Sequence, residues 1–304
     1  MYSPYHEDRL LEGQLPIQTS NVKKLLTCTM YLTDPDNPYP TIGVVTAPAG
    51  TGKSIAANVC QEAIERQFQS VLPSTLKMKV APRSTSRILS TDLLENMGER
   101  PKGDNSAQLT ADAARGIERN DTRLVIFDEG DRLNDDSFEV VRYLLDKTGC
   151  PILVIALPSI WSVIERQEKF NSRVGLRTRF DPLPIQEVID VVLPGLVLPR
   201  WSFDPKNEED RNMGEALWKR VSPSLRKLRN VLSIANKTAI ATDACKITLQ
   251  HITEAYSWVL SQEDQYLDKK RNANAPAEQA DTPEQRSIDR HEAKETKRKK
   301  KTDE

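Results

Sequence analysis

The chain has 304 residues and a formal net charge of −1, with 43 lysines and arginines against 44 acidic residues. This length predicts two compact units at most, and the balanced charge excludes a uniformly basic nucleic-acid binder but not a local basic patch. No stretch approaches the roughly 18–20 apolar residues needed to span a bilayer, and no signal-peptide pattern is visible. The four cysteines are scattered, so we expect a cytoplasmic protein with reduced thiols.

Residues 1–40 are polar and rich in proline, and they are expected to form an N-terminal extension with one short helix at 22–32. From residue 41 short apolar runs alternate with helical patterns. Strands are predicted at 42–46, 76–80, 124–127 and 152–157, and helices at 53–69, 106–119, 137–148 and 159–170. This alternation implies βαβ crossovers and a mostly parallel sheet, covered on both faces, in an α/β domain over residues 41–184.

Beyond Pro184 the pattern indicates helices alone, and we expect a small helical domain over residues 185–267. The predicted helices are 185–193, 211–221, 223–241 and 248–261. Residues 268–304 are polar and end in a basic cluster, Lys294–Lys301. Such a composition cannot bury enough apolar surface to fold, so this tail is expected to be disordered.

The strongest motif is Ala47-Pro-Ala-Gly-Thr-Gly-Lys-Ser54, which follows a predicted strand and opens a predicted helix. Glycines let backbone N–H groups point at phosphate oxygens, and a helix N-terminus adds positive dipole, so this context predicts a phosphate-binding loop. Lys53 is expected on the β- and γ-phosphates of a nucleotide and Ser54 on Mg²⁺. The predicted nucleotide-binding residues of this segment are Pro48, Ala49, Gly50, Thr51, Gly52, Lys53, Ser54 and Ile55.

The run Leu124-Val-Ile-Phe-Asp-Glu129 puts two carboxylates at the end of an apolar strand downstream of the loop. Asp128 is expected to bind Mg²⁺, directly or through water, and Glu129 to polarise the attacking water. Taken alone, a strand that ends in two acids is also common at solvent-exposed sheet edges. Together with the phosphate loop, the pair predicts a nucleotide hydrolase rather than a passive nucleotide binder.

Several arginines are candidates for stabilising phosphate charge. Arg173, Arg177 and Arg179 lie at the end of the predicted sheet domain. An arginine that reaches the γ-phosphate of a neighbouring subunit stabilises the transferred charge, and Arg173 is the candidate for this role. Arg226 lies in the first turns of a predicted helix and could reach the nucleotide from there. For each of them the alternative is an ordinary surface arginine.

Four segments resemble the AAA+ ATPases, and within them the transposition ATPases of the TnsC, TniB and Mu B type. One is the phosphate loop. Val80-Ala-Pro-Arg-Ser-Thr-Ser86 is similar to the Thr/Pro-rich segment after the family's second strand, and Phe127-Asp-Glu-Gly-Asp-Arg-Leu133 to its Asp-Glu-Ala-Asp-x-Leu run. Residues 223–232 followed by 247–252 are similar to its lid helices. The resemblance implies a P-loop AAA+ parallel sheet flanked by helices, then a small all-helical lid and the tail.

The resemblance also implies roles for single residues. Lys53 and Ser54 match ATP and Mg²⁺ ligands, Asp128 the second Mg²⁺ ligand and Glu129 the catalytic acid-base. Arg173 matches the position of the finger between subunits, and Arg226 that of the lid sensor. After the fourth strand the family usually has Gly, a small polar residue and Pro, where this chain has Ala156-Leu-Pro-Ser159. Ser159 is therefore only a candidate for the polar sensor.

By this resemblance the protein binds ATP and assembles as a ring or helical filament of identical subunits along duplex DNA, regardless of sequence. It would link a target-selector protein to a transposase and disassemble on hydrolysis, with no role at membranes. Lys102, Arg115 and Arg119 are candidates for contact with DNA phosphates. Two other functions stay open: a different AAA+ class, such as a helicase, clamp loader or initiator, and a nucleotide-switched signalling ATPase without a DNA role.

Overall fold

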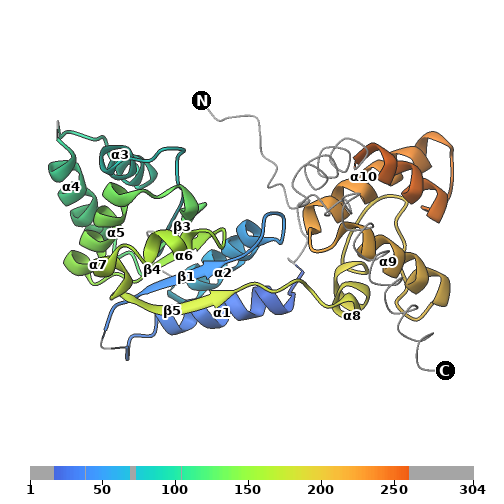
Figure 1. Ribbon diagram of the computed structural model, residues 1–304, viewed down its shortest axis with the longest axis horizontal. Helices are drawn as coiled ribbons and strands as arrows, with labels where there is room; N and C mark the ends of the chain where they lie inside the picture. Colours follow the sequence, from blue (N-terminus) through green and yellow to red (C-terminus); the bar gives the residue numbers. More distant parts are fainter. Residues whose placement is uncertain (1–16, 38, 69–72, 104, 260–304) are drawn as a thin grey trace, which may run out of the picture. The chain divides into compact units, whose positions relative to one another are not determined.

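The structure is a computed structural model that describes residues 17–37, 39–68, 73–103 and 105–259 (Figure 1). In chain order its elements are α1 (Ser20–Leu32), β1 (Ile42–Thr46), α2 (Lys53–Phe68), β2 (Thr75–Lys79), α3 (Ser86–Asn96), α4 (Ser106–Arg119), β3 (Leu124–Asp128), the 3₁₀ turn η1 (Gly130–Arg132), α5 (Asp135–Thr148), β4 (Ile152–Ala156), α6 (Ile160–Ile164), α7 (Glu168–Asn171), β5 (Val174–Arg179), α8 (Ile185–Glu187), the π-helical turn η2 (Val188–Val192), α9 (Glu208–Val221) and α10 (Leu225–Ala241). Residues 249–259 are also helical.

The five strands form one parallel sheet in the order β2–β3–β4–β1–β5, which confirms the predicted parallel sheet. β1 pairs with β4 on one side and with β5 on the other, and β3 lies between β2 and β4. Because every strand runs in the same direction, their carboxyl ends share one edge. The segments that follow β1, β3 and β4 meet at this edge, where parallel sheets usually bind their ligands.

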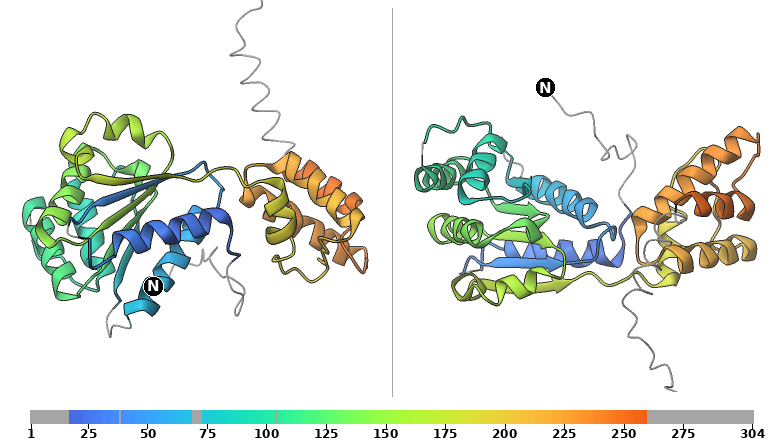
Figure 2. Two further views of the ribbon diagram at one scale, coloured as in Figure 1. Left: turned by 90° about the horizontal axis from the view of Figure 1, so that it is seen from below. Right: turned by 45° about the horizontal axis from the view of Figure 1, so that its top comes forward.

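Helices cover both faces of the sheet (Figure 2). Successive residues of a strand point to opposite faces, so Val44 and Val154 join one core while their neighbours Val45 and Ile155 join the other. The first core also contains residues of α3, α4 and α5, and the second contains residues of α1 and α2. All five strand residues of β1, β3 and β4 are buried, which explains their nearly continuous apolar sequences.

Two elements were not predicted from the sequence, and one predicted helix is broken. β5 is half-exposed along its length and carries two arginines, so it lacks the apolar run of the inner strands; its pairing with β1 makes it a strand. α3 begins behind Thr85, whose hydroxyl accepts from the Ile88 N–H at 3.3 Å. The helix predicted at 159–170 is divided into α6 and α7, with the backbone at Gln167 outside the helical region.

After the sheet, the described residues 185–259 contain helices and connecting segments. Leu217 and Trp218 of α9 and Val231 and Leu232 of α10 are buried. By internal contacts the chain divides into Met1–Ile252 and Thr253–Glu304, and residues 253–259 of the second unit are described. The predicted domain boundary at 267, the tail and residues 1–16 lie outside the described residues. None of the described helices is long and apolar enough to cross a membrane.

Candidate functional site

The segment between β1 and α2 has the backbone of a loop that wraps an anion. Gly50 and Gly52 have φ of 78° and 90°, a left-handed conformation that glycine adopts without steric cost. The Thr51 hydroxyl donates to the Pro48 carbonyl at 2.9 Å and closes the turn. Lys53 is the first residue of α2, a helix of 16 residues. The free N–H groups at the N-terminus of α2, and the positive end of its dipole, therefore face the loop.

Lys53 lies within this loop and close to the acidic residues after β3. Its ammonium group donates to the carbonyls of Ala47 at 2.7 Å and Pro48 at 3.3 Å. Burial lowers the pKa of Lys53, and the charges of Asp131, Asp128 and Glu129 oppose that shift. The structure thus brings together the lysine and the two carboxylates that the sequence predicts to act as one site. Ala49, Ser54 and Ile55 are exposed beside them.

Asp128 ends β3 and is 5% exposed. One carboxylate oxygen, Oδ1, accepts from the Glu129 N–H at 2.8 Å. Carboxylate and hydroxyl oxygens are the ligands that Mg²⁺ prefers, and Mg²⁺ usually completes its shell with water and substrate phosphates. The buried carboxylate of Asp128 and the hydroxyl of Ser54 at the start of α2 fit this donor set. These two residues would hold a Mg²⁺ ion that neutralises phosphate charge.

Glu129 follows Asp128 in a left-handed conformation with φ of 55°, which turns the chain sharply into η1. Its carboxylate forms an ion pair with Lys79 at 2.6 Å and another with Arg132. Arg132 also donates to the Val80 carbonyl at 3.0 Å. Lys79 and Arg132 were not predicted from the sequence. The available signal was register: Lys79 ends β2 and pairs with Asp128 across the sheet.

The turn after β4 lies next to the same acidic segment. The Leu157 N–H donates to Asp131 Oδ1 at 3.0 Å. Ser159, two residues further on, is exposed, and its carbonyl accepts from the Ser162 hydroxyl at 2.9 Å. The role of Ser159 as a sensor stays a prediction, and Asp131, which the sequence did not single out, accepts the hydrogen bond from this turn.

The start of α10 contacts the phosphate loop. The Arg226 N–H donates to the Gly50 carbonyl at 3.1 Å. A Cβ atom at Gly50 would lie 2.4 Å from the Ser224 hydroxyl, so the loop and the helix start are closely packed. The charge of Arg226 also contributes to the lowered pKa of Lys53. Arg226 thus lies where a residue that senses bound nucleotide is expected, although its role stays a prediction.

Arg173 lies away from this site, at the amino end of β5. β5 has six residues, and at about 3.3 Å per residue they separate its two ends by roughly 20 Å. The Arg173 guanidinium donates to both oxygens of Asp146 at 2.6 and 2.8 Å and to the Lys169 carbonyl at 2.7 Å. It therefore faces away from the phosphate loop of its own subunit. Arg177 donates to Asn171 at 2.6 Å and stacks on Trp161.

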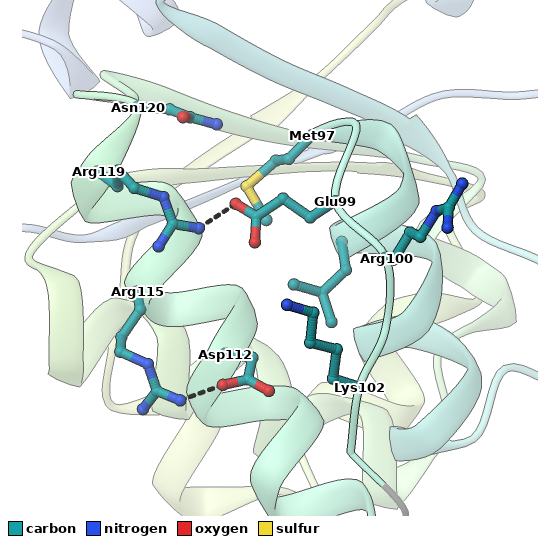
Figure 3. A pocket seen from close by; sticks show the side chains of 9 residues that line it. Met97, Glu99, Arg100, Lys102, Asp112, Arg115, Arg119 and Asn120 are labelled. Carbon is teal, nitrogen blue, oxygen red and sulfur yellow. Dashed lines mark hydrogen bonds and ion pairs between the residues drawn. The ribbon is translucent and has the colours of Figure 1, made fainter.

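The predicted DNA contacts Lys102, Arg115 and Arg119 line one pocket of about 690 Å³ (Figure 3). Arg115 and Arg119 project from α4, whereas Lys102 comes from the loop after α3. Arg119 is ion-paired with Glu99, and Arg115 with Asp112. The full lining is Leu94, Met97, Glu99, Arg100, Lys102, Asp112, Arg115, Arg119 and Asn120. Four cations against two carboxylates make the pocket positive, and Arg100 was not predicted.

Comparisons with known proteins agree with this fold. Residues 37–164 match the model of an AAA domain, and no curated protein matches the sequence significantly. The chain is similar to ORC2 of Aeropyrum pernix in its ADPNP-ADP complexes (TM-score 0.64, 13% identity, 83% of this chain and 70% of that chain). It is also similar to Cdc6p of Pyrobaculum aerophilum (0.61, 12%, 86% and 88%) and to A. pernix ORC1 in complex with DNA (0.62, 16%, 86% and 69%). Residues 37–164 thus match an AAA domain, and the chain has the P-loop AAA+ fold.

Proposed function

We propose that the protein hydrolyses ATP to ADP and phosphate at the edge formed by the carboxyl ends of β1 and β3. The observation that carries this proposal is the joint placement of Lys53 in the phosphate loop and of Asp128 and Glu129 beside it. A loop with a lysine alone serves binding, whereas a buried carboxylate followed by a second one supplies a metal ligand and a base. The ADPNP and ADP bound to the similar ORC2 structure are in keeping with this substrate.

Different residues would bind the phosphates, hold Mg²⁺ and activate water. The loop N–H groups and Lys53 would bind the phosphates, and Ser54 and Asp128 would hold Mg²⁺, which offsets their charge. Glu129 would take the proton of the attacking water, once its carboxylate turns from Lys79 and Arg132 toward the nucleotide. Neutralising and positioning charges in this way is the main source of catalysis in phosphoryl transfer.

Two arginines would complete the site. Arg226 would bind the nucleotide from the start of α10, beside Gly50. Arg173 would act on the nucleotide of a neighbouring subunit, because it lies at the far end of β5 from its own loop. Such a site is complete only in a homo-oligomer, a ring or a filament. The geometry thus supports self-assembly that depends on ATP.

The partner that we propose is duplex DNA, bound without regard to sequence. The positive pocket between α3 and α4 supports this assignment, because Lys102 of the loop after α3 lines the same pocket as Arg115 and Arg119 of α4. We further propose, from the sequence resemblance, that the protein links a target-selector protein to a transposase. Hydrolysis would then release the protein from DNA.

A second candidate is an initiator-like function. The structural similarity to ORC2, ORC1 and Cdc6p favours it, and the solved ORC1 structure contains DNA. Sequence preference separates the two candidates in the test below. We take tight binding to one DNA sequence as the mark of an initiator, and equal binding to any duplex as the mark of a transposition regulator.

Duplex DNA binding at several salt concentrations, with ADPNP present, tests the DNA assignment. The Arg100→Ala/Lys102→Ala double variant keeps the ion pairs of Arg115 and Arg119. We expect its plot of log K against log salt to be less steep, by about 0.9 for each DNA phosphate that the two side chains neutralise in the wild-type protein. The charge-matched control is Lys219→Ala/Arg220→Ala on α9, whose two side chains are exposed.

Three outcomes separate the candidates. Sequence-indifferent, salt-sensitive binding with filaments visible by negative-stain imaging supports the transposition regulator. Tight binding to one sequence supports the initiator. If DNA neither binds nor stimulates ATP turnover, the signalling ATPase is the better description and the DNA proposal fails.

A further inference from the structure

The turn η1, which follows β3, is anchored to both neighbouring strands of the sheet. Two adjacent residues of this turn reach in opposite directions. Arg132 donates to the Val80 carbonyl at the end of β2, and Asp131 accepts from the Leu157 N–H at the end of β4. Because β3 lies between β2 and β4, these two side chains join the carboxyl ends of three strands.

On the β4 side, the Asp131 carboxylate replaces a missing ladder hydrogen bond. The backbone pairing of β3 with β4 ends at Phe127 and Val154. Beyond it, the Ala156 carbonyl accepts from Ala47 on the β1 side, while the Leu157 N–H turns to Asp131 Oδ1 at 3.0 Å. The next residue is Pro158, which has no N–H to donate. A single carboxylate oxygen therefore fixes the position where the chain leaves β4.

The space for this interaction depends on Gly130. This residue is buried, and a Cβ atom there would lie 2.4 Å from Val154 Cγ1 and 3.4 Å from the Ile155 carbonyl oxygen. The backbone of η1 can approach β4 this closely because residue 130 has no side chain. Gly130 thereby brings Asp131 within hydrogen-bond distance of the turn after β4.

The same carboxylate also acts on the phosphate loop. Of the three acidic residues that oppose the lowered pKa of Lys53, Asp131 has the largest effect, ahead of Asp128 and Glu129. Asp131 thus bonds to the turn that leads to Ser159, and its charge also acts on the lysine of the loop. It carries no role in the hydrolysis described above.

We propose that Asp131 is a positioning residue for ATP turnover, which holds the turn after β4 in register with the phosphate loop through its hydrogen bond to Leu157. This inference rests on the proposed ATPase function. Asp131 acts through the hydrogen bond that its carboxylate accepts from the Leu157 backbone. Its loss should lower turnover more than it weakens ATP binding.

The experiment compares Asp131→Ala and Asp131→Asn with the wild-type protein and with Asp136→Ala, an exposed acid in the first turn of α5. Asn keeps an oxygen that can accept from Leu157, and Ala does not. We expect kcat to fall roughly tenfold or more in Asp131→Ala, the value of a hydrogen bond to a charged group. The Kd of a fluorescent ATP analogue should stay close to wild type. Asp131→Asn should recover kcat to within about threefold of wild type.

A second readout does not depend on turnover. Amide hydrogen exchange of a peptide that covers Leu157 should quicken in Asp131→Ala and stay slow in Asp131→Asn and Asp136→Ala. If the wild-type protein hydrolyses no ATP but the exchange pattern holds, the proposed function fails and the hydrogen bond to Leu157 stands.

Wild-type kcat in Asp131→Ala, or parallel losses of kcat, ATP affinity and Tm, would overturn the positioning role. An Asp131→Asn variant as slow as Asp131→Ala would also overturn it. Should Asp131→Ala fail to fold, Asp131→Asn decides by itself: slow turnover or fast exchange contradicts the proposal.

Discussion

Lys53 illustrates how a short motif predicts a residue's place well before its neighbours are known. The glycines and the following helix fix where its side chain begins, and that much follows from residues 47–54 alone. Its electrostatic surroundings depend on segments far away in sequence. Asp131 and Arg226, which act on its pKa, come near Lys53 because of the sheet order and the position of α10.

Replacing Lys53 by Ala should weaken nucleotide binding itself. The variant loses a cation that is half-buried and directed into the loop, so its interaction with phosphates cannot be replaced by water at full strength. We expect the Kd of a fluorescent ATP analogue to rise roughly 10- to 100-fold, the value of hydrogen bonds to charged groups. Lys24→Ala, which removes an exposed lysine on α1 that pairs with Asp181, is the control. A Kd equal to that of the wild type would remove Lys53 from the site.

The cysteines offer a test of the packing that is independent of nucleotide. Burial raises the pKa of Cys150 to about 12 and that of Cys60 to about 11, whereas Cys245 is exposed. Because the thiolate is the reactive form, iodoacetamide at pH 8 should label Cys245 first and leave Cys60 and Cys150 until the protein unfolds. Peptide mass spectrometry over time gives the order. Early labelling of Cys150 would show that this thiol, next to the start of β4, is not buried.

Residue motifs predicted part of the site, and tertiary contacts supply the rest. The loop and the Asp128–Glu129 pair were predictable because phosphate chemistry restricts the residue types at fixed spacing. Lys79 and Arg132 were not, since an ion pair to Glu129 depends on strand register and on the turn after β3. A lysine at a strand end and an arginine after an acidic pair have many ordinary explanations in sequence alone.

At the scale of elements, inner strands and edge strands differ in how well the sequence predicts them. β1, β3 and β4 are buried on both faces, so their apolar runs are clear. β5 lies at the sheet edge, its side chains are half-exposed or exposed, and Arg177 and Arg179 interrupt the pattern. α3 was missed for a related reason: its mixed sequence is weakly patterned, and its packing in the core with α4 and α5 makes it a helix.

The position of β5 leads to a prediction about assembly. Its first strand residue follows Arg173, whose guanidinium is held by Asp146 at the edge opposite the phosphate loop. If Arg173 acts on a neighbour's nucleotide, Arg173→Ala and Glu129→Gln subunits should be inactive alone. Mixed together they should regain ATP turnover, because some interfaces then carry an intact arginine and an intact glutamate. Steady-state ATPase assays over a range of mixing ratios measure this.

Asp146→Ala is the informative companion to that experiment. It releases Arg173 without removing it, so Asp146→Ala subunits, which keep both the arginine and the glutamate, should hydrolyse ATP on their own. No recovery at any ratio, with both Arg173→Ala and Glu129→Gln folded and assembled, would make Arg173 a surface residue that stabilises its own subunit through Asp146.

At the level of the whole molecule, the residues of the proposed nucleotide site and of the proposed DNA-binding pocket all lie outside the tail. Residues 268–304 contain no motif of the ATPase site, and their charge is concentrated in Lys294–Lys301. A chain that ends at Leu267 should therefore hydrolyse ATP at the wild-type rate. Its DNA affinity should fall at low salt, and the difference should shrink as salt rises, because the tail would attract DNA through charge alone. Loss of basal ATPase in the truncated protein would place the domain boundary elsewhere.

In the proposed function, Glu129 activates water at a site where ATP is bound independently of it. Steady-state ATP turnover by Glu129→Gln, measured beside the Kd of an ATP analogue, tests it most directly. Gln keeps the size of the side chain and removes the base, so turnover should fall by about 10²–10⁴-fold while the Kd stays near the wild-type value. Near-normal hydrolysis by Glu129→Gln would exclude Glu129 as the residue that activates water.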